Sequence, residues 1–82
     1  MVKGSFMFKI ADYGNDTECA NGEELMATLR GKYAGKSVSI HYRRKSGVTW
    51  TEFVDITEEG HVTDSYKGND FNLDDVLEKA AG

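Results

Sequence analysis

The chain has 82 residues, of which 39% are hydrophobic and 29% are charged, and it contains no proline. These values describe one small globular domain and exclude a disordered tail, a collagen-like chain or a low-complexity chain. Its apolar runs are only a few residues long, so we expect no membrane-spanning segment. The single cysteine cannot form an internal disulfide, which predicts a protein of the reducing cytoplasm.

The N-terminal part of the chain predicts one strand followed by a loop. Phe6, Phe8 and Ile10 alternate with the residues between them, which is the period of a half-buried strand. Since Met7 would itself begin this strand well, residues 1–5 are expected to be disordered or foreign to the natural chain. Residues 14–18, Gly-Asn-Asp-Thr-Glu, are expected to form a polar loop.

A first helix is predicted from its capping residues. Asn21 is a favourable N-cap, and Glu24 stands three positions later, where its side chain can reach back to the backbone N–H of the cap. One apolar stripe follows at helical spacing, formed by Leu25, Met26, Leu29 and Tyr33. Because Gly31 weakens the last turn, the helix is expected to end between residues 30 and 34, with Gly35 as the stop.

The middle of the chain predicts a β-hairpin. A strand with Val38, Ile40 and Tyr42 on one face leads into a three-residue loop at 45–47, in which Gly47 takes the left-handed conformation. A third strand runs over 48–56, and pairing residue 44 with residue 48 sets Tyr42 against Trp50 and Val38 against Val54. The same register sets Ile40 against Glu52, so we expect a bulge near Glu52.

The C-terminal part predicts a turn at 58–60, a short fourth strand over 61–66 and a final helix. Val62 is expected to face Ile56 across the turn. Asn72 caps the helix with Asp75 as its reciprocal acid, and Phe71 with Val76 forms a hydrophobic staple. The fold class is therefore α+β, in the order β-α-β-β-β-α, with an antiparallel sheet and two helices on one face.

Charge is strongly segregated along the chain, whose net charge is −4. Residues 1–24 carry −3, residues 25–51 carry +6 without a single acid, and residues 52–82 carry −7. A basic segment of this kind, with aromatic residues nearby, predicts a binding site or a segment neutralised within the fold by the C-terminal acids. The candidate binding residues are Lys36, His41, Tyr42, Arg43, Arg44, Lys45, Trp50 and Phe53.

No complete catalytic, metal or cofactor motif is present, so we expect a protein that is not an enzyme and has no cofactor. The cysteine and two histidines lack the spacing of a zinc site. A small enzyme that uses Cys19 with His41 or His61 is the second alternative function, since a cysteine just before a helix N-terminus is expected to have a lowered pKa.

The favoured hypothesis is a small protein-binding module, such as an inhibitor, an antitoxin or immunity protein, or an accessory regulator. With both helices on one face, the other face of the sheet would present Met7, Lys9, His41, Arg43, Thr49, Thr51 and Phe53. This face or an edge strand could bind a protein partner or a second copy of the chain. The first alternative is single-stranded nucleic-acid binding through the basic hairpin at 43–45, which the acidic net charge disfavours.

Overall fold

The computed structural model describes residues 6–80, so the expectation for residues 1–5 lies outside the described residues. Its elements follow the order β-β-α-β-β-β-α. They are β1 (Phe8–Asp12), β2 (Asn15–Cys19), α1 (Gly22–Lys32), β3 (Ser37–Arg43), β4 (Thr49–Ile56), β5 (Val62–Asp64) and α2 (Leu73–Lys79). Neither these helices nor any other in residues 6–80 has the length and apolarity to cross a membrane.

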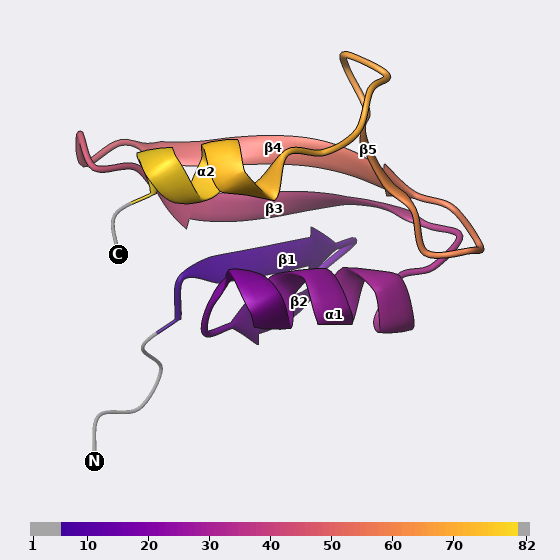
Figure 1. The fold of residues 1–82 in the computed structure, drawn as a ribbon. Coiled ribbons are helices and arrows are strands. Elements are labelled where there is room, and N and C mark those ends of the chain that lie inside the picture. Colours follow the sequence, from indigo (N-terminus) through magenta and orange to yellow (C-terminus); the bar gives the residue numbers. More distant parts are fainter. Residues whose placement is uncertain (1–5, 81–82) are drawn as a thin grey trace.

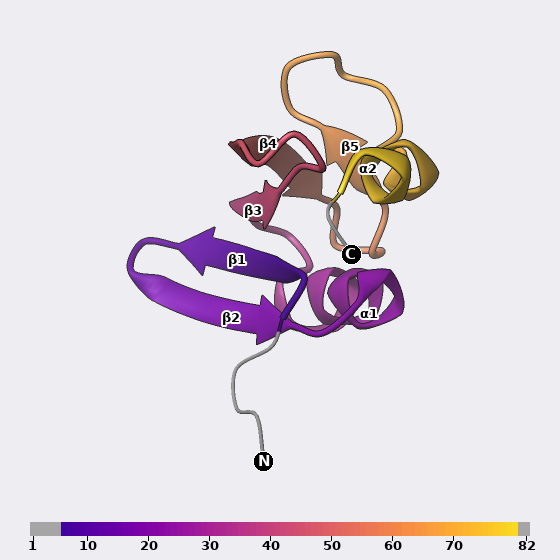
Figure 2. The same cartoon turned by 90° about the vertical axis from the view of Figure 1, so that its left-hand side faces the viewer.

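The five strands form one antiparallel sheet in the order β2-β1-β3-β4-β5. Both helices cover the same face of this sheet, α1 beside β1 and β2 and α2 beside β4 and β5 (Figures 1 and 2). The expected α+β fold with two helices on one face is therefore confirmed. The core lies between sheet and helices and contains Phe8, Ile10, Cys19, Leu25, Leu29, Tyr33, Val38, Ile40, Tyr42, Val54, Ile56, Val62, Val76 and Ala80.

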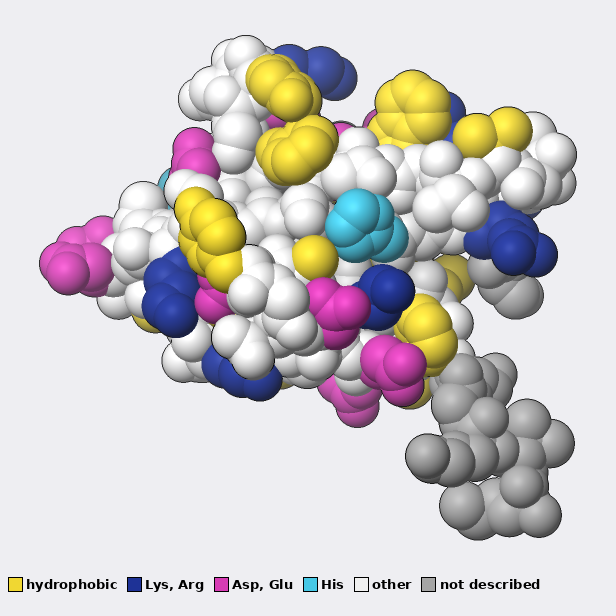
Figure 3. Space-filling model, turned by 180° about the vertical axis from the view of Figure 1, so that it is seen from behind, with side chains coloured by type: hydrophobic (Ala, Val, Ile, Leu, Met, Phe, Trp, Pro, Cys, Tyr) yellow, Lys and Arg dark blue, Asp and Glu magenta, His cyan; other side chains and the backbone are white. Residues whose placement is uncertain are grey.

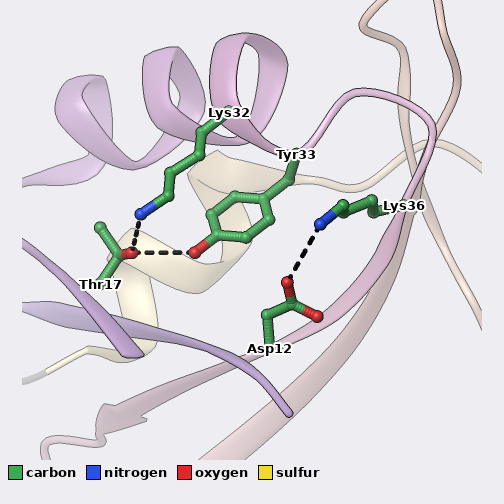
Figure 4. A network of polar contacts seen from close by, with 5 residues as sticks. All are labelled: Asp12, Thr17, Lys32, Tyr33 and Lys36. Atoms are coloured by element: carbon green, nitrogen blue, oxygen red, sulfur yellow. Dashed lines mark hydrogen bonds and ion pairs between the residues drawn. The ribbon is translucent and has the colours of Figure 1, made fainter. Parts of the chain in front are cut away.

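The prediction of a loop at 14–18 is wrong, because residues 15–19 form the edge strand β2. A two-residue turn joins β1 to β2, and both turn residues have a positive φ, 48° at Tyr13 and 91° at Gly14. Thr17 and Cys19 face the helices and are at least partly buried, whereas Asp16 and Glu18 are exposed. At the other side of this hairpin, the hydroxyl of Tyr33 lies 2.8 Å from that of Thr17 and fastens the end of α1 to β2 (Figure 4).

The central hairpin has the register expected from the sequence. Tyr42 pairs with Trp50, Val38 with Val54, and Gly47 has a φ of 94°. The prediction of a bulge near Glu52 is wrong, since the pairing of β3 with β4 is continuous. Glu52 needs no bulge because it lies at the margin of the core, where its carboxylate accepts a hydrogen bond of 3.3 Å from the Tyr42 hydroxyl.

The ends of the other elements differ from expectation in small ways. Asn21 and Asn72 cap the two helices as expected, accepting from the N–H groups of Glu24 and Asp75. The Glu24 carboxylate accepts from the N–H of Ala20, one residue before the cap, because the chain bends there out of β2. β5 is shorter than the expected strand at 61–66, although Val62 does pair with Ile56. Phe6, expected on the inner face, precedes β1 and is 42% exposed.

Candidate functional site

The structure divides the predicted binding residues between the two faces of the sheet. Tyr42, Arg44 and Trp50 lie on the helix side, and His41, Arg43 and Phe53 lie on the open face, because side chains alternate along β3 and β4. Two lysines lie apart from both groups. Lys36, at the opposite end of β3, forms an ion pair of 3.4 Å with Asp12 (Figure 4). The backbone N–H of Lys45 donates to Lys79 where α2 ends.

The three basic residues of the hairpin at 43–45 are not neutralised within the described part of the chain. The ion pairs formed by residues 6–80 join Lys9 to Asp16, Lys36 to Asp12 and Lys79 to Asp75, and His61 is hydrogen-bonded to Asp70. None of them involves residues 43–45. Arg43 and Lys45 are exposed, whereas Arg44 is partly buried.

Arg44 and Trp50 form a stacked pair on the helix side. The guanidinium carbon lies 3.8 Å from the centroid of the indole, which is the arrangement of a cation–π contact. The Nε–H of Arg44 is buried and has no acceptor among the described residues. Beside this pair, burial raises the pKa of the Tyr42 hydroxyl, against the opposing effect of Arg44. Trp50 itself is 41% exposed, so the pair lies at the surface of the molecule.

The N-terminal half of β4 has a free backbone edge. Val48, just before β4, is hydrogen-bonded to Arg44, and Ile56 at the end of β4 is hydrogen-bonded to Lys36. The even-numbered residues of β4 between them therefore direct their backbone N–H and C=O groups to β3. The backbone N–H and C=O groups of the odd-numbered residues therefore point away from β3, towards the edge of the sheet. β5 pairs only with residues 54–56, and the N–H of Ser65 donates to the carbonyl of Phe53. Within residues 6–80, this leaves the N–H and C=O groups of Thr49 and Thr51 without a neighbouring strand.

A groove with a volume of about 730 Å³ follows this free edge. Its floor is β4 from Trp50 to Phe53, and one wall is α2, where positions 72, 75, 76 and 79 face the groove at helical spacing. The other wall is the connection from β5 to α2, which rises beside the edge strand (Figures 1 and 2). We call this the edge groove. It combines unpaired backbone groups, an exposed indole and charged side chains of both signs.

The open face of the sheet is mainly polar at its centre. The two ring nitrogens of His41 lie 2.9 Å from the hydroxyl of Thr51 and 3.3 Å from that of Ser39. A shallow hollow nearby is bordered by Tyr13 and Tyr66, which are 99% and 81% exposed. Hydrophobic side chains occur in separate groups on this face rather than in one continuous patch (Figure 3). The open face thus presents mainly polar side chains with small apolar groups between them.

The cysteine and the histidines do not come together. Cys19 is fully buried on the helix side, His41 lies on the open face, and His61 pairs with Asp70 at 2.7 Å near the β5 turn. The expectation of a lowered thiol pKa is wrong, because burial raises the pKa of Cys19. Within residues 6–80, no group of three or more His, Cys, Asp and Glu side chains is arranged to hold a metal ion.

The sequence predicted neither the free edge of β4, which defines the edge groove, nor the exposed tyrosines Tyr13 and Tyr66, which border the hollow on the open face. The free edge arises because β5 is short, and strand length is weakly encoded in the polar segment that follows Val62. Tyr13 and Tyr66 each stand between polar residues or glycine, and this isolation is the sequence signal that indicates their exposure. No family model, curated protein or solved structure matches the chain.

Proposed function

We propose that this protein is a small, non-enzymatic protein-binding module that receives an extended segment of a partner along the free edge of β4. The observation that carries the proposal is the pair of residues Thr49 and Thr51, whose outward backbone groups have no strand beside them within residues 6–80. Thr51 also lines the edge groove. An added strand satisfies such groups, and this is how several peptide-binding domains acquire their ligands.

The walls of the edge groove support a strand better than they support a small molecule. An extended segment beside β4 would direct alternate side chains to the helix side, where Trp50, Phe71 and Val76 offer apolar contacts. Arg44 and Lys67 supply cations, while Glu52, Asp64 and Asp75 supply anions. A partner with mixed polar and apolar residues suits this lining, whereas a strongly acidic or basic one does not.

The proposed setting is the cytoplasm, where the buried, unpaired Cys19 would stay reduced. A role as an inhibitor, antitoxin or immunity protein, or accessory regulator is compatible with a module that acts only by binding. Single-stranded nucleic acid remains the alternative ligand, and the free cations at 43–45 favour it. The positions of the aromatic residues disfavour nucleic acid as the ligand, because Trp50 and His41 lie on opposite faces of the sheet and cannot stack on neighbouring bases of one strand.

Peptide display on the full chain tests the proposal. We expect a library of random linear peptides to yield binders that change the emission of Trp50, the single tryptophan of the chain. Thr51→Pro removes one outward backbone N–H donor. Because that N–H points away from β3, the substitution breaks no hydrogen bond within the sheet. It should lower the affinity for these peptides by about tenfold. Glu18→Pro, at an outward position of the opposite edge strand, is the matched control. Binders that do not distinguish the two variants would contradict the proposal.

A further inference from the structure

We propose that the free edge of β4 pairs with the same edge of a second copy, with Trp50 of each copy at the two-fold axis. This inference rests on the proposed function, because it names the first occupant of the same edge. Two antiparallel β4 strands centred on Trp50 place Thr49 of one copy opposite Thr51 of the other, twice. Each of these pairs exchanges two backbone hydrogen bonds. The pairing therefore satisfies the free groups of Thr49 and Thr51 and requires no others.

The register is fixed by what lies at the end of the free edge. Ser65 already donates to the carbonyl of Phe53, so the position beside Phe53 is occupied. A pairing centred on Thr51 would need that position for Thr49 of the second copy, and it is therefore blocked. The connection from β5 to α2 rises beyond the paired segment, towards the C-terminal end of β4 (Figure 1). An axis at Trp50 brings Gly47 of the second copy towards Phe53 instead. Gly47 asks for no hydrogen bond there, because it is a turn residue with a φ of 94° whose N–H already donates to the carbonyl of Arg44 in its own chain.

The side chains on the helix side match across the same axis. Trp50 and Val48 are 41% and 54% exposed, and the pairing brings the two indoles into contact and sets Val48 opposite Glu52 of the second copy. Arg44 pairs with Val48 within one copy, and Val48 faces Glu52 of the second copy. The three side chains therefore lie next to one another across the interface, in the order Arg44, Val48 and Glu52 of the second copy. The Nε–H of Arg44 lacks an acceptor in the single chain, and this arrangement brings a carboxylate towards that guanidinium.

On the open face, the opposed residues are threonines, with Arg43 and His41 as their neighbours in β3. No like-charged pair is created at neutral pH. The two-fold axis stands perpendicular to the sheet, so the dimer would have one continuous sheet with all helices on one face. The contact is short and smaller than the interfaces of permanent dimers, so association should depend on concentration and leave the edge open to a tighter partner.

Sedimentation and fluorescence on the full chain test this pairing together. The weight-average mass should rise from 9.1 kDa towards twice that value as concentration increases. Trp50 emission should move to shorter wavelength over the same concentrations, since each indole leaves water. Thr51→Pro and, independently, Thr49→Pro should weaken association about tenfold or more, while Glu18→Pro should leave it unchanged. Circular dichroism confirms the fold of each variant, and Thr49→Pro leaves the His41 contact of Thr51 intact.

A disulfide tests the register itself. Trp50→Cys in a Cys19→Ala background places one thiol on the axis at a non-hydrogen-bonded pair, where strands approach most closely. Oxidation should link two copies in high yield, and Thr51→Cys in the same background, which is offset from the axis, should do so poorly. Dimers that survive both proline variants, or that fail to link through position 50, would overturn the edge pairing. A mass of 9.1 kDa at every concentration would overturn the second copy as occupant. Peptides selected as above would still test the proposed function.

Discussion

Cys19 shows how burial decides the chemistry of a single residue. The thiol lies just before the N-terminus of α1, a position that favours the thiolate, yet it is fully enclosed by the core. Desolvation raises its pKa above the ordinary 9.0, and this outweighs the opposing hydrogen bond with Thr28. A neutral thiol is a poor nucleophile, so the position of Cys19 suits packing rather than catalysis.

This shift predicts a loss of stability in alkaline solution. Because the folded-state pKa is higher than 9.0, the contribution of the neutral thiol is complete below that pH and is lost as the pH rises through the folded pKa. The free energy of unfolding from urea titrations should therefore fall above pH 9.0. Cys19→Ala should be less stable at neutral pH, because it leaves a small cavity, but its decline with pH should be shallower.

Tyr42 provides the internal control for this measurement. Burial also raises the pKa of its hydroxyl above 10.0, so its effect has the same sign and begins at a higher pH in both proteins. As the pH rises, the unfolding free energy of the parent should first approach that of Cys19→Ala, because only the parent has the thiol. At higher pH both values should fall together, because both proteins contain Tyr42. Parallel pH curves over the whole range would contradict the assigned role of the thiol.

Two glycines near the end of α1 differ in what they do for this element. Gly31 lies inside the helix with nothing within 4 Å of an added Cβ, whereas Gly35 has a φ of +80°. Gly31→Ala should raise the free energy of unfolding by about 0.5–1 kcal/mol, since it removes backbone entropy from the unfolded chain. Gly35→Ala should lower it by about 1–2 kcal/mol, because the left-handed conformation strains an L side chain.

Urea unfolding of the two variants in one buffer checks this contrast. The N–H of Gly35 donates to the carbonyls of Ile56 and Thr57, so a shift of its backbone would also disturb the connection from α1 to β3. Equal effects of the two substitutions would mean that residues 31 and 35 share one backbone environment, contrary to the structure.

The elements that the sequence predicted well are those with strong local signals. Asn21 and Asn72 define both helix starts, and the alternation of Val38, Ile40 and Tyr42 with a glycine loop defines the central hairpin. β2 escaped prediction because asparagine, aspartate and glutamate are poor strand formers. Its turn also places Tyr13 at a positive φ, where asparagine is the usual signal of a hairpin.

The candidate site was less predictable than the fold, because it depends on where strands end. The stacking of Arg44 on Trp50 follows from the register of the hairpin and was within reach of sequence reasoning. The free edge at Thr49 and Thr51 was not, since it exists only because β5 stops at Asp64 and the chain turns away at Ser65. Such a feature is set by tertiary structure rather than by local preference.

At the scale of the whole molecule, the segregated charge does not become a single basic surface. Arg43 projects on the open face and Arg44 on the helix side, while Lys45 lies in the loop between β3 and β4. On the open face, Asp16 and Glu18 of β2 add negative charge near Lys9, which already pairs with Asp16 at 3.8 Å. A nucleic-acid strand crossing this face would meet cations and acids in turn.

We therefore expect no appreciable binding of single-stranded nucleic acid. Stacking platforms for bases need exposed aromatic rings beside a continuous track of cations. Here Arg44 covers the ring of Trp50, Phe53 packs edge-on against Tyr66 at a centroid distance of 5.3 Å, and the net charge of −4 repels phosphates. The anisotropy of a fluorescent oligothymidine should stay constant on addition of the protein at low salt. A rise that disappears with added salt, and in the triple variant Arg43→Ala, Arg44→Ala, Lys45→Ala, would instead assign the hairpin to nucleic-acid recognition.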